Sequence, residues 1–121
     1  MKSKKNVKKI EPVESKKNLP ITKEQRTQPY WALLNTVFDP ELGIGVVDLG
    51  LIYDIEEKAG HITVTMTLTS MGCPVGPSLM RSVQTEMERY LGAEEVTVNL
   101  VWEPVWSRQL IDPDVRAMLF D

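Results

Sequence analysis

The only thiol of the chain lies in a loop that is rich in proline and glycine. Cys73 stands in "TLTSMGCPVGPSLM", where an alternating apolar pattern changes to a helical one. A helix start offers unpaired backbone N–H groups and the positive end of the helix dipole, and both favour the thiolate, which attacks electrophiles or binds metal. Gly72 and Gly76 are predicted to permit unusual backbone angles and the close approach of a ligand. Cys73 is therefore the first candidate for chemistry, and its alternative is a small buried apolar side chain.

The groups that could assist this thiol are few. A cysteine hydrolase needs a histidine base, and the single histidine, His61, is predicted at the other end of the preceding strand, roughly 20 Å away. Asp39 and Glu41 in "DPELG", and Asp48 further on, could instead reach the same edge of the sheet as Cys73. They would provide either a carboxylate-plus-thiolate metal site or the base of a thiol-dependent enzyme. Asp39 before Pro40 is also an ordinary helix stop.

Two helices and a hairpin are predicted before and after this loop. A first helix is predicted with Thr27 as its cap and Pro29 in its first turn, and it ends at Asp39–Pro40. An alternative start lies at Thr22, where Gln25 would complete a capping box. An antiparallel hairpin follows, and then a long helix closed by Gly92. The positions that indicate these elements are apolar: Tyr30, Leu33, Leu34 and Val37 for the first helix; Leu51, Tyr53 and Ile55, then Ile62, Val64, Met66 and Leu68, for the strands; Leu79, Val83, Met87 and Tyr90 for the long helix.

A third strand and a last helix complete the pattern. Val96, Val98, Leu100 and Trp102 alternate as a strand, and Asp112-Pro113 opens a short helix. The order α-β-β-α-β-α predicts an α+β fold, with a small, mostly antiparallel three-stranded sheet and helices packed on one face.

Composition and charge exclude several classes of protein. Residues 1–20 carry seven Lys and two Glu, a balance of +5, which predicts a disordered, Lys-rich tail. Because the charge of the whole chain is −3, residues 21–121 carry −8, and they are predicted to form the single domain. An acidic body argues against nucleic-acid binding. One cysteine cannot form an internal disulfide, so a reducing, cytoplasmic setting is expected. No apolar run approaches the length of a membrane span.

Three blocks of sequence carry a resemblance to a known family. "DPELGIGVVDLGLIYDI", "MTLTSMGCPVGP" and "LVWEPVW" occur in this order and resemble the signature blocks of the SufT/PaaD-like family of iron–sulfur cluster assembly factors. The resemblance covers about residues 27–121. It implies a small α+β domain, without enzymatic turnover, that helps carry or deliver iron–sulfur clusters to apo-proteins, together with other assembly or carrier proteins. An accessory protein dedicated to one metalloenzyme is an alternative.

The resemblance also implies the site residues. Asp39, Glu41 and Cys73 are the candidates for contact with a cluster or metal, and the supporting positions are Thr67, Thr69, Gly72 and Glu103. Iron–sulfur clusters usually take four thiolates, whereas this chain has one, so the cluster is expected to be transient or not stably bound. A homodimer could share Cys73 across a twofold axis, other ligands could complete the site, or the chain could act as an adaptor. Trp106, beyond the third strand, is a candidate for partner contact, since aromatic residues anchor interfaces.

Overall fold

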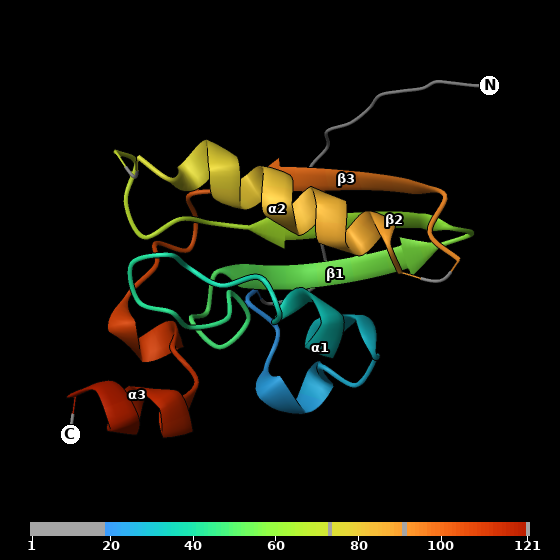
Figure 1. The fold of residues 1–121 in the computed structure, drawn as a ribbon. Coiled ribbons are helices and arrows are strands. Elements are labelled where there is room, and N and C mark those ends of the chain that lie inside the picture. Colours follow the sequence, from blue (N-terminus) through green and yellow to red (C-terminus); the bar gives the residue numbers. More distant parts are fainter. Residues whose placement is uncertain (1–18, 73, 91, 121) are drawn as a thin grey trace.

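A three-stranded sheet with the strand order β1-β2-β3 organises the protein (Figure 1). The computed structural model describes residues 19–72, 74–90 and 92–120; residues 1–18 of the tail predicted over residues 1–20, as well as Cys73, Leu91 and Asp121, lie outside the described residues. The strands are β1 (Ile52–Lys58), β2 (His61–Met66) and β3 (Glu95–Leu100), and the α-helices are α1 (Tyr30–Leu34), α2 (Gly76–Glu88) and α3 (Pro113–Phe120). The predicted α+β class and element order are confirmed.

The two strand pairings run in different directions. β1 and β2 form the predicted antiparallel hairpin, whereas β3 joins β2 in parallel, with Ile62 opposite Val96 and Met66 opposite Leu100. The parallel pairing follows from the chain path, because α2 carries the chain back along the sheet before β3 begins. As a result β2 and β3 end, and β1 begins, at the same end of the sheet.

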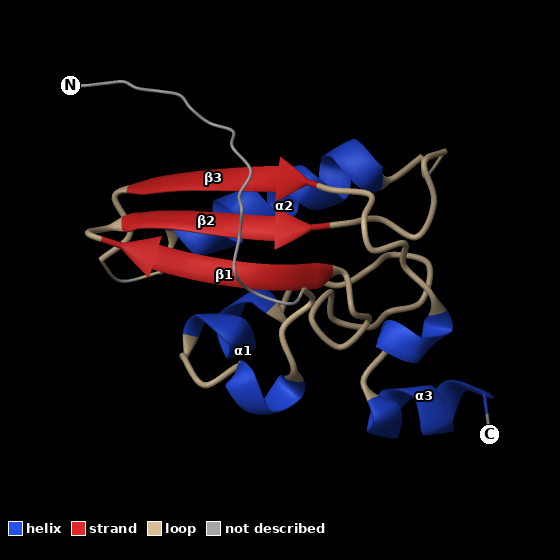
Figure 2. Ribbon diagram, turned by 180° about the vertical axis from the view of Figure 1, so that it is seen from behind, coloured by secondary structure: helices blue, strands red, loops and turns tan. Residues whose placement is uncertain are grey.

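α2 covers one face of this sheet, and no described helix covers the other face (Figure 2). The predicted stripe of Leu79, Val83 and Met87 is buried, and it packs on the alternating side chains of β2 that the sequence placed in the core. α1 contacts α2, and the ring of Tyr30 meets that of Tyr90 edge to face at 5.5 Å. α3 lies beyond the end of the sheet rather than on its face (Figure 1).

The first helix is shorter than predicted. α1 ends at Leu34, whereas the apolar spacing indicated a helix that continues through Val37. The side chain of Asn35 explains the early end, because its Oδ1 accepts hydrogen bonds from the backbone N–H groups of Val47 and Asp48, both at 3.0 Å. The capping box at Thr22 is present, but it opens a separate 3-10 helix over Lys23–Gln25.

A β-bulge breaks the alternation predicted for β1. The register shifts between Ile52 and Asp54, so Ile52 and Ile55 share the helix-covered face opposite Met66 and Val64. The predicted face of Leu51, Tyr53 and Ile55 is therefore wrong. A bulge redirects the side chain of the extra residue, and here that residue is Tyr53.

Asp112 links the segment before α1 to the start of α3. Its Oδ1 caps α3 by accepting from the N–H of Asp114 at 2.9 Å, as the sequence predicted, and its Oδ2 lies 2.6 Å from Nζ of Lys23. Burial alone would raise the pKa of Asp112, but the hydrogen bonds from Lys23 and from the backbone of Asp114 and Val115 outweigh it and lower the pKa.

Asp112→Ala is expected to lower the free energy of unfolding at pH 7 by about 1–2 kcal/mol, because both the cap and the ion pair are lost. Asp112→Asn should cost less, since asparagine also caps. A carboxyl group whose pKa is lowered by folding stabilises the protein above its unfolded pKa, and this contribution disappears as the pH falls through the folded value. Urea unfolding at pH 7 and pH 3 checks both points: the difference between wild type and Asp112→Asn should shrink at pH 3, and a constant difference would contradict the ion pair.

None of the helices that the structure describes has the length and apolar character needed to cross a membrane.

Candidate functional site

All three sequence blocks meet at one end of the sheet, where β2 and β3 end (Figure 1). We call this region the loop end; it comprises residues 36–51, 67–75 without Cys73, and 101–112. Four long-range hydrogen bonds join the three blocks. They run from Thr67 N to Leu51 O at 2.8 Å, from Val101 N to Met66 O at 2.8 Å, from Tyr53 Oη to Pro104 O at 2.6 Å, and from Trp106 Nε1 to Leu49 O at 2.8 Å. Each block is thus bonded to the other two.

Thr67 lies in the interior at the centre of the loop end. The residue is 1% exposed, and its hydroxyl oxygen has no hydrogen-bond partner of good geometry among the described residues. A buried hydroxyl group without a partner costs folding free energy, so its presence calls for an explanation other than stability.

Two candidate site residues, Thr67 and Glu103, affect the pKa of the Tyr53 phenol. Burial raises the pKa of the Tyr53 phenol, the neighbouring Thr67 hydroxyl lowers it by a smaller amount, and the negative charge of Glu103 raises it further. Both candidate residues therefore affect the pKa of this phenol, although they come from different blocks. The carboxylate of Glu103 is exposed and remains available to a ligand.

Asp39 organises the first block through its own side chain. It is 6% exposed, and its Oδ1 accepts from the N–H groups of Glu41 at 2.7 Å and Leu42 at 3.1 Å. Its backbone N–H donates to Ile44 O at 2.9 Å, which closes the loop. Glu41 itself is exposed at the loop surface. Asp39 thus fixes the loop that presents Glu41.

The second block differs from its prediction at one glycine. Gly72 does not have a positive φ angle, and a Cβ atom there would meet no described atom within 4 Å, so an unusual backbone angle is not what this position needs. At Gly76 the prediction of close approach is met by the protein itself, because a Cβ atom would lie 2.7 Å from Cδ1 of Leu68. Thr69 is exposed. The thiol of Cys73 falls outside the described residues, so its role stays a prediction.

Trp106 is half-buried and packs against the hydrophobic core, and its indole N–H is already bonded within the protein. Its contact with a partner stays a prediction, confined to the exposed part of the ring. Val105 beside it is 72% exposed.

The described carboxylates and histidine do not form a metal site by themselves. Within residues 19–72, 74–90 and 92–120, no three His, Cys, Asp or Glu side chains lie close enough to hold one ion. His61 is exposed at the opposite end of β2, where its Nε2 lies 2.9 Å from Oγ1 of Thr97. His61 therefore lies too far from the loop end to serve as a base there, in agreement with the distance predicted from the sequence.

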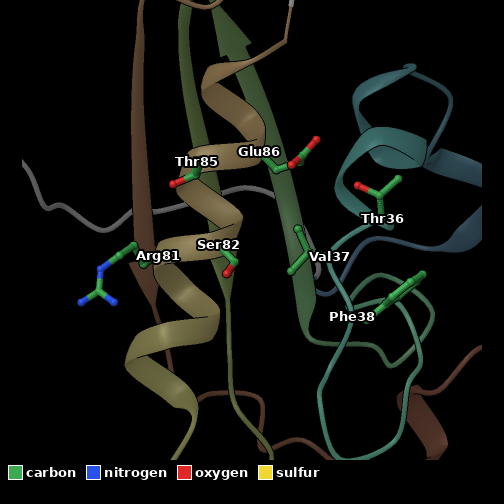
Figure 3. Close-up of a pocket in the computed structure, with 7 residues that line it drawn as sticks. All are labelled: Thr36, Val37, Phe38, Arg81, Ser82, Thr85 and Glu86. Atoms are coloured by element: carbon green, nitrogen blue, oxygen red, sulfur yellow. The ribbon is translucent and has the colours of Figure 1, made fainter.

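A cleft of about 440 Å³ lies beside the loop end, between α2 and the chain that follows α1 (Figure 3). Ser82 and Glu86 face Val37 and Phe38 across it, whereas Arg81 points away from them. Phe38 is 61% exposed and directly precedes Asp39. None of the candidate site residues lines this cleft, which Thr36 and Thr85 complete.

Sequence reasoning missed two residues that build the site. Tyr53 was named only as an apolar strand position, and Asn35 was not singled out, yet each fixes a loop through side-chain hydrogen bonds to distant backbone groups. The bulge that redirects Tyr53 has no local sequence signal. Asparagine is a common residue at helix ends, but Asn35 lies before Val37, within the apolar stripe, so the spacing of apolar residues concealed this signal.

Comparisons with known proteins agree with this architecture. The family described as "Iron-sulfur cluster assembly protein" matches residues 31–100. The chain is 45% identical over 84 residues to the "Fe-S protein maturation auxiliary factor SufT" of Staphylococcus aureus, a match that covers 69% of this chain and 96% of the relative. It is 42% identical over 76 residues to the "Fe-S protein maturation auxiliary factor YitW" of Bacillus subtilis, a match that covers 62% of this chain and 74% of the relative.

Among solved structures, a Bacillus anthracis protein described as "Domain of Unknown Function DUF59" superposes with a TM-score of 0.69 at 35% identity, and the match covers 74% of this chain and 86% of that one. The family match includes the first two blocks and reaches the start of the third. The chain therefore belongs to the iron–sulfur cluster assembly protein family.

Proposed function

We propose that this protein is an iron–sulfur maturation factor that carries or delivers clusters to apo-proteins, and that the loop end is where the cluster is handled. The observation that carries the proposal is the joining of the three family blocks at one end of the sheet by four long-range hydrogen bonds. Relatives that are named maturation auxiliary factors support the same role. We further propose an accessory role without enzymatic turnover, in the cytoplasm, together with cluster carriers and client proteins.

The cluster is proposed to be cargo that is bound transiently. Cys73 supplies one soft thiolate ligand, and the carboxylates of Glu41 and Glu103 are exposed on neighbouring loops. Because stable clusters usually take four thiolates, one chain alone would hold a cluster weakly. A second copy that contributes its own thiol, or a client cysteine, would complete the ligand set. Weak binding suits delivery, since a complete cage would release the cluster slowly.

Anaerobic reconstitution tests this proposal directly. The full chain is incubated with iron and sulfide, and bound iron, visible absorption and oligomeric state are measured before an apo iron–sulfur enzyme is added. Cluster absorption that is lost as the client becomes active would support direct carriage. Activation of the client by an added carrier, without absorption on this chain, would support the adaptor alternative. Absence of any effect on client activation would contradict the proposed function.

Thr67→Val separates function from folding. Valine keeps the shape of threonine and removes a buried hydroxyl that has no good partner, so the free energy of unfolding should stay equal or rise by about 1 kcal/mol. Client activation should nevertheless fall, because we assign the hydroxyl to the site. Thr65→Val on the open face of β2 is the matched control. A loss of stability with Thr67→Val, or normal client activation, would contradict this assignment.

A further inference from the structure

The hydroxyl group of Tyr53 does more than packing in the core requires. It is the extra residue of the β1 bulge and is fully buried, yet its hydroxyl donates to the carbonyl oxygen of Pro104, 51 residues away, at 2.6 Å. A phenylalanine would fill the same volume. The hydroxyl therefore has a separate task, which is to hold the turn of residues 103–106 against the start of β1.

Two side-chain hydrogen bonds, from Tyr53 and from Trp106, hold the turn of residues 103–106 in place. The phenol has one proton, and that proton is donated to Pro104 O. Trp106 holds the far side of the same turn through Leu49 O. Glu103 directly precedes Pro104 and follows Val101, whose N–H donates to Met66 O at 2.8 Å, so the chain is fixed on both sides of Glu103.

We propose that Tyr53 is a positioning residue for the loop end: its hydroxyl holds the turn of residues 103–106 against β1 and so fixes where the Glu103 carboxylate stands. The inference rests on the proposed function, because the task of that carboxylate is to meet the cluster or the client. Tyr53 itself touches neither. Burial raises the pKa of the phenol above its ordinary value of 10.0, so the donating proton is retained throughout the neutral range.

Tyr53→Phe tests the inference, with Tyr30→Phe as the matched control. Tyr30 is also buried, and its hydroxyl also donates to a distant backbone carbonyl, that of Ile55 at 3.3 Å, but away from the loop end. Both variants should show similar shifts in melting temperature. Tyr53→Phe alone should slow cluster transfer to an apo client by about tenfold, the usual scale for a lost supporting contact at a metal site. Equal transfer by the two variants would overturn the inference.

A double-mutant cycle shows whether Tyr53 acts through Glu103. If it does, Tyr53→Phe combined with Glu103→Gln should slow transfer no more than the stronger single variant, whereas multiplied effects would mean independent roles and would overturn the inference. Glu103→Asp gives a test that does not depend on how Tyr53→Phe folds. Glu103 is exposed, so the change should not affect folding, and it only moves the carboxylate by the length of one methylene group. It should slow transfer nearly as much as Glu103→Gln, and full transfer by Glu103→Asp would overturn the inference. Failure of the wild type to have any effect on client activation would instead refute the proposed function.

Discussion

Cys73→Ser is expected to abolish activation of an apo iron–sulfur client, and this is the largest functional effect that we predict. Serine is close to cysteine in size, but its hydroxyl is a far poorer ligand for soft iron–sulfur chemistry. The melting temperature should be nearly unchanged. Client activity is measured with equal concentrations of folded protein, after anaerobic loading with iron and sulfide. Iron retained by the variant should fall to the level of a blank.

Ser70→Ala, an exposed change in the same loop, is the control and should load and transfer normally. Three outcomes separate the alternatives. Equal activation by wild type and Cys73→Ser would refute a cluster-handling role for the thiol. A large loss of stability with normal delivery would mean that Cys73 is a packing residue. Loss of turnover of a small substrate, without any iron, would instead indicate the thiol-dependent enzyme.

Gly50→Ala is expected to cause the largest loss of stability, at least about 3 kcal/mol. Gly50 has a φ of +79°, which disfavours any side chain, and a Cβ atom there would overlap the backbone of Leu110, with its carbonyl oxygen closest. Backbone atoms cannot rotate away as the end of a side chain can, so the turn and the segment before α3 would have to separate. Overpacking and backbone strain together account for this magnitude. Urea unfolding measures it.

Gly43→Ala provides the matched comparison. Gly43 has a similar φ of +70°, but a Cβ atom there would meet no described atom within 4 Å. This variant should cost only the strain of a left-handed backbone, on the order of 1 kcal/mol. The difference between the two variants isolates the steric overlap with Leu110. Equal losses would show that the segment before α3 can move away from Gly50 at no cost.

The parts of the fold that the sequence predicted well are those governed by local periodicity. α2 and β2 each bury one face, so their apolar residues recur every three or four positions in the helix and every second position in the strand. Elements governed by distant partners were predicted less well. α1 ends early because Asn35 bonds to a loop twelve residues on, and β1 changes register at a bulge. Neither event leaves a mark in the spacing of apolar residues.

The candidate site shows the same division. Thr67 and Glu103 were predicted from a resemblance between sequence blocks, and both affect the pKa of one phenol. That phenol, Tyr53, was named only as an apolar position of a strand, because its bond to Pro104 O spans 51 residues and has no local signal in the sequence. Asp39 was predicted as a ligand, and its contacts show that it also shapes the loop that carries Glu41. Side chains that act on distant backbone groups need the folded structure to be recognised.

The long span of the bonds at the loop end has a consequence for synthesis on the ribosome. The β1–β2 hairpin can form once Met66 has left the exit tunnel, because its partners are neighbours in sequence. The loop end must wait for Pro104 and Trp106, whose bonds reach back 51 and 57 residues. Contacts between distant residues close late, after local structure exists. The proposed cluster site is therefore assembled only after Trp106 has left the exit tunnel, and under the proposed function cargo could be loaded only from that point of translation onward.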